Sequence, residues 1–223
     1  MATRQSKNFI RLFGPMKVDV SLYPAFERPS LLDLYVDGGI KHYRSKPMHL
    51  GQTIQGKWDL QAKLWIGDGD SKKMRPISFP DPLQLWLPRK KDFSDFEAAL
   101  KIIPKENFAL EIEAYGFLGG RRDQEWGGIL SAMEYIRVNP WKKITFFGTS
   151  SQILILNPGK NSFEHRGIFS LFSFKKQKIF LNGKIDYQGH IELPGFSTRG
   201  LSNFSKGKWT LRNQHPLILM LLG

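Results

Sequence analysis

The stretch LQLWLPRKKDFSDFEAALKIIPKENFALEIEAYGF, residues 83–117, decides how the first part of the chain is expected to fold. It sets a helical pattern between two apolar runs. Ser94 stands three residues before Glu97, which is typical of a capped helix start, and Phe96 and Ile103 recur at helical spacing. A strand, a helix and a strand in this order predict two parallel strands joined by a helix.

The same alternation extends on both sides of this stretch. Further strands are expected at 8–13, 31–36, 62–66 and 142–148, and a second helix at 125–136. Strands that alternate with helices favour a parallel sheet covered on both faces. We therefore predict an α/β N-terminal domain over residues 1–149 with a mostly parallel, Rossmann-like sheet.

The last third of the chain has a different pattern. Short apolar runs are separated by turn residues, no helical pattern interrupts them, and Asn182-Gly183 is a strong hairpin signal. Such a pattern is typical of small antiparallel structures. We predict a small all-β sandwich domain over residues 150–223, closed by the apolar tail.

Composition narrows the class of protein. The 223 residues are 41% hydrophobic and 24% charged, which is ordinary for a globular chain, and the absence of cysteine excludes disulfides and fits a cytoplasmic location. The N-terminus lacks the apolar core of a secretory signal, and no run reaches the roughly 20 apolar residues that span a bilayer.

The net charge of +13 favours polyanionic ligands. Charge alone also fits a soluble protein with a basic surface. Since no aromatic-and-basic recognition motif is visible, we expect neither a specific nucleic-acid partner nor a membrane partner.

Charged residues follow four of the predicted strands directly. The clusters are Asp37 with Gly38 and Gly39, Asp68 with Asp70, Lys91 with Asp92 and Asp95, and Arg121 with Asp123. Each one alone could be a surface turn or a helix start. Because the carboxyl ends of parallel strands lie along one edge, where ligands bind, the four together favour a site.

The residue types in these clusters suggest phosphate chemistry. Converging carboxylates repel each other unless a cation neutralises them, and ligands that are all oxygen point to Mg²⁺. Lys91 and Arg121 can hold phosphate oxygens. Transfer of a phosphoryl-type group needs this mixture of metal, cations and positioning.

At this point the chain resembles the thiamine pyrophosphokinase family. The motifs that carry the resemblance are VDGG (36–39), IGDGDS (66–71), KKDFSDFEAAL (90–100), GFLGGRRDQ (116–124), ILILNPGKNSFEH (153–165), GFSTRGLSN (195–203) and NQHPLILMLL (213–222). They cover nearly the whole chain from Asp37 onward.

The resemblance implies an enzyme that transfers the diphosphate of ATP to the hydroxyl of thiamine, giving thiamine diphosphate and AMP. It implies Mg²⁺ as cofactor, ATP as co-substrate, and a homodimer whose thiamine site is completed by the β domain of the partner. Carried over by motif, the catalytic residues are Asp68, Asp70, Asp92 and Asp95, of which Asp68, Asp70 and Asp95 hold the metal. ATP is bound by Asp37, Gly38, Gly39, Ser71, Lys91, Arg121, Asp123 and Gln124, and thiamine by Ser202, Asn203 and Leu219.

Departures from the family pattern leave two alternatives open. Gly128 stands where the family usually has Asn or Ser, Leu219 stands where many eukaryotic members have a Trp that packs on thiamine, and Gly69 replaces an apolar residue. One alternative is a diphosphotransferase of the same fold that acts on another alcohol, such as a hydroxymethyl pterin. The other is a relative without catalysis that binds nucleotide or nucleic acid.

Overall fold

The computed structural model describes residues 9–18, 30–44, 62–70, 83–103, 110–140 and 142–223. The elements of the first part are β1 (Phe9–Phe13), β2 (Leu32–Val36), the 3₁₀ turn η3 (Asp37–Ile40), α1 (Lys41–Arg44), β3 (Ala62–Gly67), β4 (Leu83–Trp86), α2 (Asp95–Ile102), β5 (Leu110–Tyr115), α3 (Arg122–Val138) and β6 (Lys142–Phe147). Those of the second part are β7 (Ser151–Leu156), β8 (Gly159–Phe172), β9 (Gln177–Ile185), β10 (Gly189–Leu193), β11 (Asn203–Asn213) and β12 (Leu217–Leu222).

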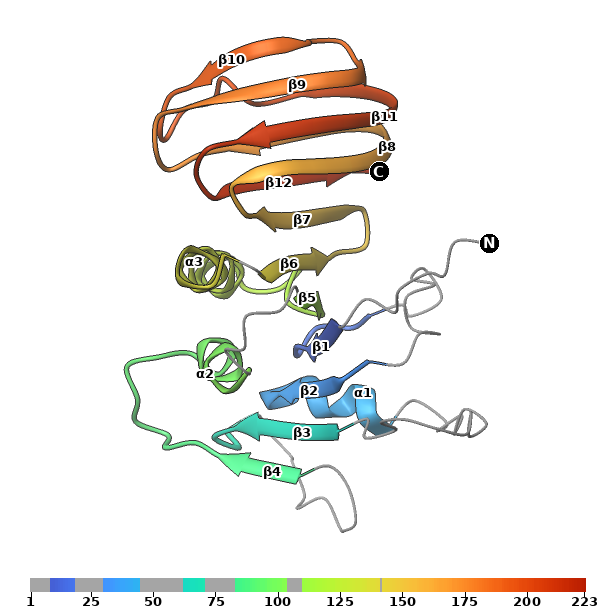
Figure 1. Cartoon of the computed structure of the whole chain (residues 1–223). Coiled ribbons are helices and arrows are strands. Elements are labelled where there is room, and N and C mark those ends of the chain that lie inside the picture. Colours follow the sequence, from blue (N-terminus) through green and yellow to red (C-terminus); the bar gives the residue numbers. More distant parts are fainter. Residues whose placement is uncertain (1–8, 19–29, 45–61, 71–82, 104–109, 141) are drawn as a thin grey trace, which may run out of the picture.

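All the strands belong to one 12-stranded mixed sheet (Figure 1). Its order is β10-β9-β11-β8-β12-β7-β6-β5-β1-β2-β3-β4. The pairs among β1 to β6 are parallel, and every pair from β6–β7 onward is antiparallel.

The predicted fold class, a Rossmann-like α/β domain followed by a separate small β sandwich, is therefore wrong. β7 turns back directly onto β6, with Gly148 N donating to Ser151 O at 2.9 Å, and Ile144 pairs in register with Ile155. The hydrogen-bonded ladder thus passes without a break from the parallel to the antiparallel strands. The helical patterns stop at this point of the sequence, but the sheet does not. The predicted division at residues 149 and 150 falls in this turn and stays a prediction.

The expected cover of helices on both faces is not found in the described ranges either. Only α2 and α3 are longer than about one turn there, and Figure 1 shows both on the same side of the sheet, where they contact each other. No helix among the described residues is long and apolar enough to cross a membrane.

Strand β7 contributes to two apolar cores. Its residues alternate in direction, as side chains of a strand must. Ile153 and Ile155 join the core under α2 and α3, which also contains Phe96 and Ile136. Leu154 and Leu156 join a second core, built only from β7 to β12. The two parts of the molecule therefore share a strand as well as a sheet.

The hairpin predicted at Asn182-Gly183 is wrong, since both residues lie inside β9. Gly183 has a φ of +119°, and a Cβ there would come within 2.6 Å of Lys208 O. The register between β9 and β11 shifts close by, between Ser205 and Trp209. Glycine is thus required here by a bulge and by the close approach of a neighbouring backbone, and not by a hairpin turn.

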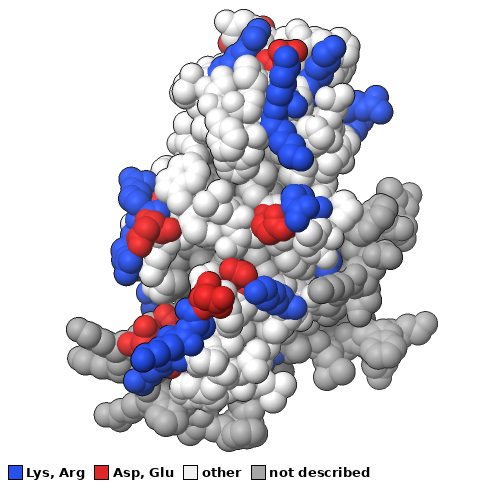
Figure 2. Space-filling model, turned by 90° about the vertical axis from the view of Figure 1, so that its left-hand side faces the viewer, with Lys and Arg blue, Asp and Glu red and all other residues white. Residues whose placement is uncertain are grey.

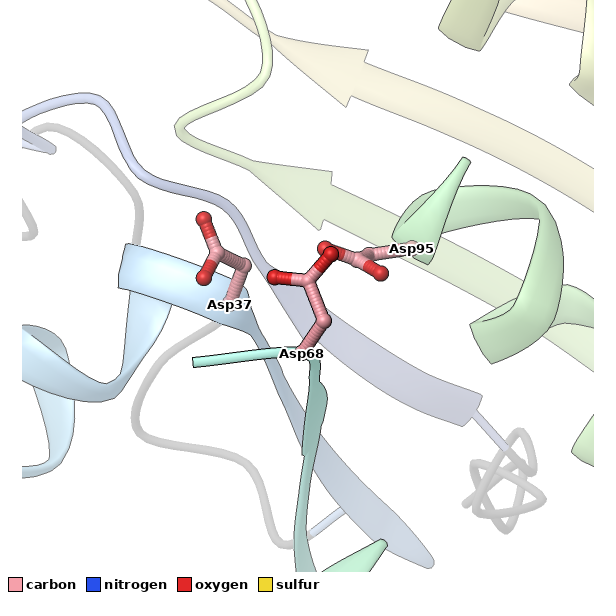
Figure 3. Close-up of side chains that lie close together, drawn as sticks. All are labelled: Asp37, Asp68 and Asp95. Atoms are coloured by element: carbon pink, nitrogen blue, oxygen red, sulfur yellow. The ribbon is translucent and has the colours of Figure 1, made fainter. Parts of the chain in front are cut away.

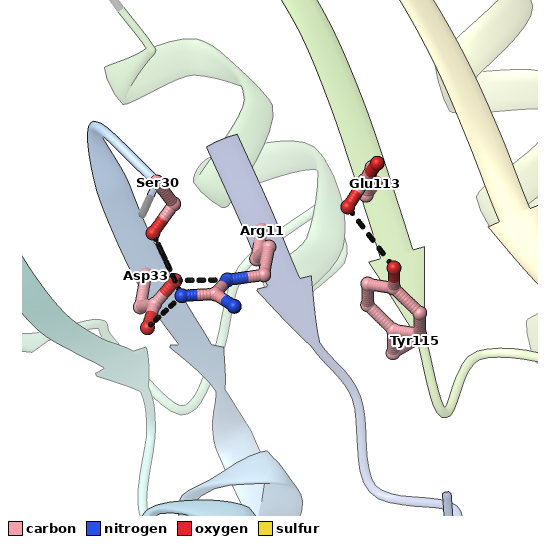
Figure 4. A network of polar contacts seen from close by, with 5 residues as sticks. All are labelled: Arg11, Ser30, Asp33, Glu113 and Tyr115. Carbon is pink, nitrogen blue, oxygen red and sulfur yellow. Dashed lines mark hydrogen bonds and ion pairs between the residues drawn. The ribbon is translucent and has the colours of Figure 1, made fainter. Parts of the chain in front are cut away.

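The face of the parallel strands away from α2 and α3 carries a buried polar network (Figure 4). Arg11 donates from Nε to Asp33 Oδ1 at 2.7 Å and from Nη2 to Asp33 Oδ2 at 3.1 Å, and Ser30 Oγ donates to Asp33 Oδ1 at 2.6 Å. On β5, Tyr115 Oη donates to Glu113 Oε2 at 3.0 Å. The bidentate Arg11–Asp33 pair matches the register of β1 against β2. A shift of this register would leave a charge buried without its partner.

Candidate active site

Asp37 is placed by the turn that follows β2. It begins η3 with a φ of +45°, a strained value for a residue with a side chain, and Trp65 Nε1 donates to its carbonyl oxygen at 2.9 Å. Gly39 lets this turn pass the end of β1, because a Cβ there would lie 1.8 Å from Phe13 O. Gly39, which was predicted to bind ATP, is therefore required as glycine by the packing of this turn against β1.

Asp68 follows β3 directly and forms a buried ion pair with Lys91, whose ammonium donates to Asp68 Oδ2. Burial alone would raise the pKa of Asp68. The hydrogen bond from Lys91 and the bond from Asp70 N to Asp68 Oδ1, at 3.1 Å, together outweigh burial, so the pKa of Asp68 is lowered. Asp68 is thus held as a carboxylate.

Asp95 is the first residue of α2, and the predicted helix cap fixes its position. Ser94 Oγ accepts a hydrogen bond from Glu97 N at 3.1 Å, which confirms half of the predicted capping box. The other half is absent in this helix, since Glu97 pairs with Lys101 at 2.7 Å instead. Lys91 Nζ lies 3.0 Å from Asp95 Oδ1. Burial nevertheless outweighs the attraction of Lys91 and raises the pKa of Asp95.

These elements bring three carboxylates together (Figure 3). Asp37, Asp68 and Asp95 each offer an oxygen, and the three oxygens lie within 4.8 Å of one another. Lys91 bridges Asp68 and Asp95, with 9% of its side chain exposed against 8% and 17% for theirs. Burial would lower the pKa of Lys91, but its bonds to the two carboxylates raise it instead.

The donor set fits a hard divalent cation. All three donors are carboxylate oxygens, the ligands that Mg²⁺ prefers. Asp95 Oδ1 is buried, and apart from its ion-pair contact with Lys91 no side chain in the described ranges is a hydrogen-bond partner for it. One ammonium balances fewer charges than the cluster carries, so a further cation would be stabilised here.

Asp70 lies beside this cluster and is exposed. The charge of Asp68, then burial, then the charge of Asp37 raise the pKa of Asp70. Gly69 between the two aspartates has a φ of +71°, and a Cβ there would lie 2.7 Å from the Trp86 ring. Glycine at this point is needed for the turn and for the packing of Trp86.

The remaining residues predicted at this edge fall into two groups. Asp92 is exposed in the loop before α2, while Arg121, Asp123 and Gln124 are exposed at the start of α3. Arg121 Nη2 donates to Asp123 Oδ2 at 2.6 Å, and this contact lowers the pKa of Asp123. Ser71 lies outside the described residues.

Glu125 was not found from the sequence, although it holds the glycine loop before α3. Its Oε1 accepts from Gly119 N and from Gly120 N, the latter at 3.0 Å, and its Oε2 lies 3.3 Å from Arg122 Nη1. An acidic residue in the first turn of a helix was the available signal. Gly128, one turn further on, is buried and faces Phe96 and Phe146, so its position belongs to the packing of α3.

Two of the predicted thiamine residues, Ser202 and Asn203, lie toward the other end of the sheet. Ser202 N donates to Ser170 Oγ at 3.1 Å, and Asn203 Nδ2 donates to Gly200 O at 2.8 Å, at the start of β11. β11 is seven strands away from β2 in the sheet order, roughly 30 Å along the sheet at about 4.8 Å per strand. Leu219 is fully buried in the core of β7 to β12.

No protein-family model matches the sequence, and no curated protein matches it significantly. Solved structures do match. Thiamine pyrophosphokinase from Bacillus subtilis is 17% identical with a TM-score of 0.69, over 97% of this chain and 99% of that one. Thiamin pyrophosphokinase from Candida albicans is 14% identical with a TM-score of 0.70, over 100% and 96%. Yeast thiamin pyrophosphokinase is 13% identical with a TM-score of 0.62, over 99% and 87%. The predicted resemblance is confirmed, and the chain has the fold of these enzymes.

Proposed function

We propose that this protein is a Mg²⁺-dependent thiamine diphosphokinase. It transfers the diphosphate of ATP to the hydroxyl of thiamine and releases AMP. The observation that carries the proposal is the cluster of Asp37, Asp68 and Asp95, bridged by Lys91, in a chain with the fold of thiamine pyrophosphokinases. Three carboxylates at the ends of β2, β3 and the loop before α2 form a place for a metal-bound triphosphate.

The residues of this edge have distinct roles in the proposed reaction. Asp68 and Asp95 would hold the metal together with Asp37 of the same cluster, and Asp70 beside them keeps its predicted place as a further ligand. Mg²⁺ supplies charge neutralisation on the phosphate oxygens when it is bound. Lys91 and Arg121 bind phosphate oxygens, and Glu125 holds the glycine loop in place. Gly38, Ser71, Asp123 and Gln124 are proposed to bind the nucleotide, as the sequence predicted.

The bond changes follow from diphosphate transfer. The thiamine hydroxyl oxygen bonds to the β-phosphorus of ATP, and the bond from that phosphorus to the α–β bridging oxygen breaks. The hydroxyl proton passes to a carboxylate of the site, Asp70 or Asp92, and the bridging oxygen leaves with AMP. Both carboxyls are exposed, as proton exchange with solvent requires.

We further propose that two copies of the chain share each site. Ser202 and Asn203 lie too far along the sheet to meet the acidic cluster of their own chain. In a homodimer the partner subunit supplies this segment to the cluster. A cytoplasmic location stays a prediction.

The test is a direct assay. The protein is incubated with ATP, Mg²⁺ and thiamine, and AMP and thiamine diphosphate are followed by chromatography, with Asp68→Asn and Asp70→Asn alongside. Both products are expected from the wild-type protein, with at least a hundredfold loss in Asp68→Asn. No turnover by a folded protein that holds ATP and Mg²⁺ would indicate a relative without catalysis.

A second acceptor is favoured by one observation. Leu219, at the position where an aromatic ring would pack on thiamine, is fully buried and offers no surface to a ligand. An alcohol of another shape, such as a hydroxymethyl pterin, would then take the place of thiamine. Calorimetry that shows binding of thiamine and none of the pterin would remove this candidate, whereas AMP without thiamine diphosphate would favour it.

A further inference from the structure

The outer face of β8, β11, β9 and β10 is strongly basic. Along each strand the buried residues alternate with exposed ones, and the exposed positions share one face because the strands pair in register. We call this surface the basic face. Its cations include Lys160, Arg166, Lys178, Lys184, Lys208 and Arg212. In Figure 2, Lys and Arg outnumber Asp and Glu at the top, the end formed by these strands.

The cations of the basic face stand opposite one another. Arg166 pairs in register with Lys206, and Lys160 with Arg212. Like charges directly opposite across a ladder destabilise a sheet. Such an arrangement is compensated when a polyanion binds.

Acidic side chains neutralise only part of this charge. Lys206 Nζ lies 2.6 Å from Asp186, and Lys208 Nζ lies 3.9 Å from Glu164. Lys160, Arg166, Lys184 and Arg212 have no acidic side chain within ion-pair distance among the residues that the structure describes. Four cations therefore remain available to an external ligand.

Rings stand among these cations. Phe180 is 36% exposed, lies opposite Arg212 in the ladder, and its ring contacts that of His190 with centroids 4.8 Å apart. Phe204 is 42% exposed, next to Lys206 along β11. An acidic protein or a membrane surface would satisfy the cations but has no need of exposed rings between them. Unpaired bases stack on such rings while their phosphates meet the cations.

We propose that the basic face binds single-stranded nucleic acid, with phosphates on its Lys and Arg side chains and bases on Phe180 and Phe204. The proposal goes beyond the proposed function: within one chain the face lies at the other end of the sheet from the acidic cluster, and binding of nucleic acid needs neither ATP nor thiamine. Sequence patterns did not reveal it, since its cations are two, four or six residues apart along separate strands and form no long charge run.

The experiment measures fluorescence anisotropy of a labelled U-rich RNA of about 20 nucleotides, from about 50 to 200 mM salt. The full chain is compared with the triple variant Lys160→Gln, Arg166→Gln, Arg212→Gln. We expect the variant to bind at least fivefold more weakly at low salt, with the slope of log affinity against log salt reduced by about 2. Phe180→Ala is expected to weaken binding without changing this slope.

The matched control removes three exposed cations from the helices, in Lys101→Gln, Arg122→Gln, Arg137→Gln, and is expected to keep the affinity. An equal loss in both triple variants would overturn the proposal, since net charge would then explain the binding. So would tighter binding to phosphatidylserine vesicles or to duplex DNA than to the RNA. Thermal unfolding of each variant separates loss of binding from loss of fold.

Discussion

At the scale of single residues, Lys91 competes with a metal ion for the same carboxylates. Its ammonium bridges Asp68 and Asp95, two of the carboxylates proposed to hold Mg²⁺. Two cations in one small cluster repel each other. Lys91 therefore stabilises the metal-free protein and weakens metal binding. This opposition ends when the ammonium pairs with the phosphate oxygens of a bound nucleotide.

This argument predicts the behaviour of Lys91→Met, which keeps the length of the side chain and removes the charge. Without divalent cations we expect its free energy of unfolding to be about 1–3 kcal/mol lower than that of the wild type, because buried carboxylates lose their partner. We expect Mn²⁺, followed by calorimetry, to bind about tenfold more tightly, since roughly 1.4 kcal/mol of repulsion is relieved. Lys90→Met, an exposed neighbour, is the control. Weaker Mn²⁺ binding in Lys91→Met would mean that the lysine serves only to orient the carboxylates.

The raised pKa of Asp95 predicts a dependence of stability on pH. A carboxyl whose pKa is higher in the folded than in the unfolded state contributes most at low pH, and the contribution is lost as the pH rises through the folded pKa. Urea unfolding without divalent cations should therefore show wild type losing stability relative to Asp95→Asn as the pH rises above about 4. A difference between the two that stays constant from about pH 4 to 7 would contradict this.

At the scale of single elements, α2 shows how much of the site the sequence could predict. Its cap, its apolar face and the strand after it were all evident from local spacing, and the structure confirms them. The position of Lys91 against Asp68 was not evident, because the two residues are 23 positions apart in the sequence, on either side of β4. Local patterns predict elements, whereas contacts between distant residues depend on the packing of the whole sheet.

The cap of α2 is also a testable part of the site. Ser94→Ala removes the acceptor for Glu97 N, and such a change costs about 1 kcal/mol. Because Asp95 begins this helix, we expect Mn²⁺ affinity to fall as well, by a few-fold. Ser94→Asp restores an acceptor at the same position and should recover both properties. If Ser94→Ala lowers stability while Mn²⁺ affinity is unchanged, the cap does not position Asp95.

At the scale of the whole molecule, the continuous sheet was the part that the sequence could not show. The change from helical to purely β pattern near residue 149 is real, but a short hairpin joins the two parts edge to edge. Hydrogen bonds between β6 and β7 leave no trace in the pattern of either strand. The change of pattern therefore marked the end of the helices that cover the sheet, whereas the sheet itself continued across this point.

The shared strand predicts that residues 1–149 do not fold alone. This fragment would lose Ile153, Ile155 and Ile218 from the core under the helices and would leave β6 as an open edge. We expect the full chain to unfold in a single calorimetric transition and the fragment to lack the dispersed amide spectrum of a folded protein. A folded fragment, or two separate transitions of the full chain, would instead support two independent domains.

The separation of the acidic cluster from Ser202 and Asn203 makes the sharing of sites testable by complementation. Asp68→Asn disables one end of the site and Asn203→Ala the other, so each homodimer should be inactive in the thiamine assay. When two differently tagged variants are mixed, half of the dimers contain one subunit of each kind, and each of these has one intact site of two. About a quarter of wild-type activity should return. Asp68→Asn mixed with Lys91→Met is the matched control, because both changes damage the same end and no intact site can form. Mixed dimers recovered through both tags yet inactive would show that the site is completed within a single chain, in which case the segment around Ser202 acts on the fold alone.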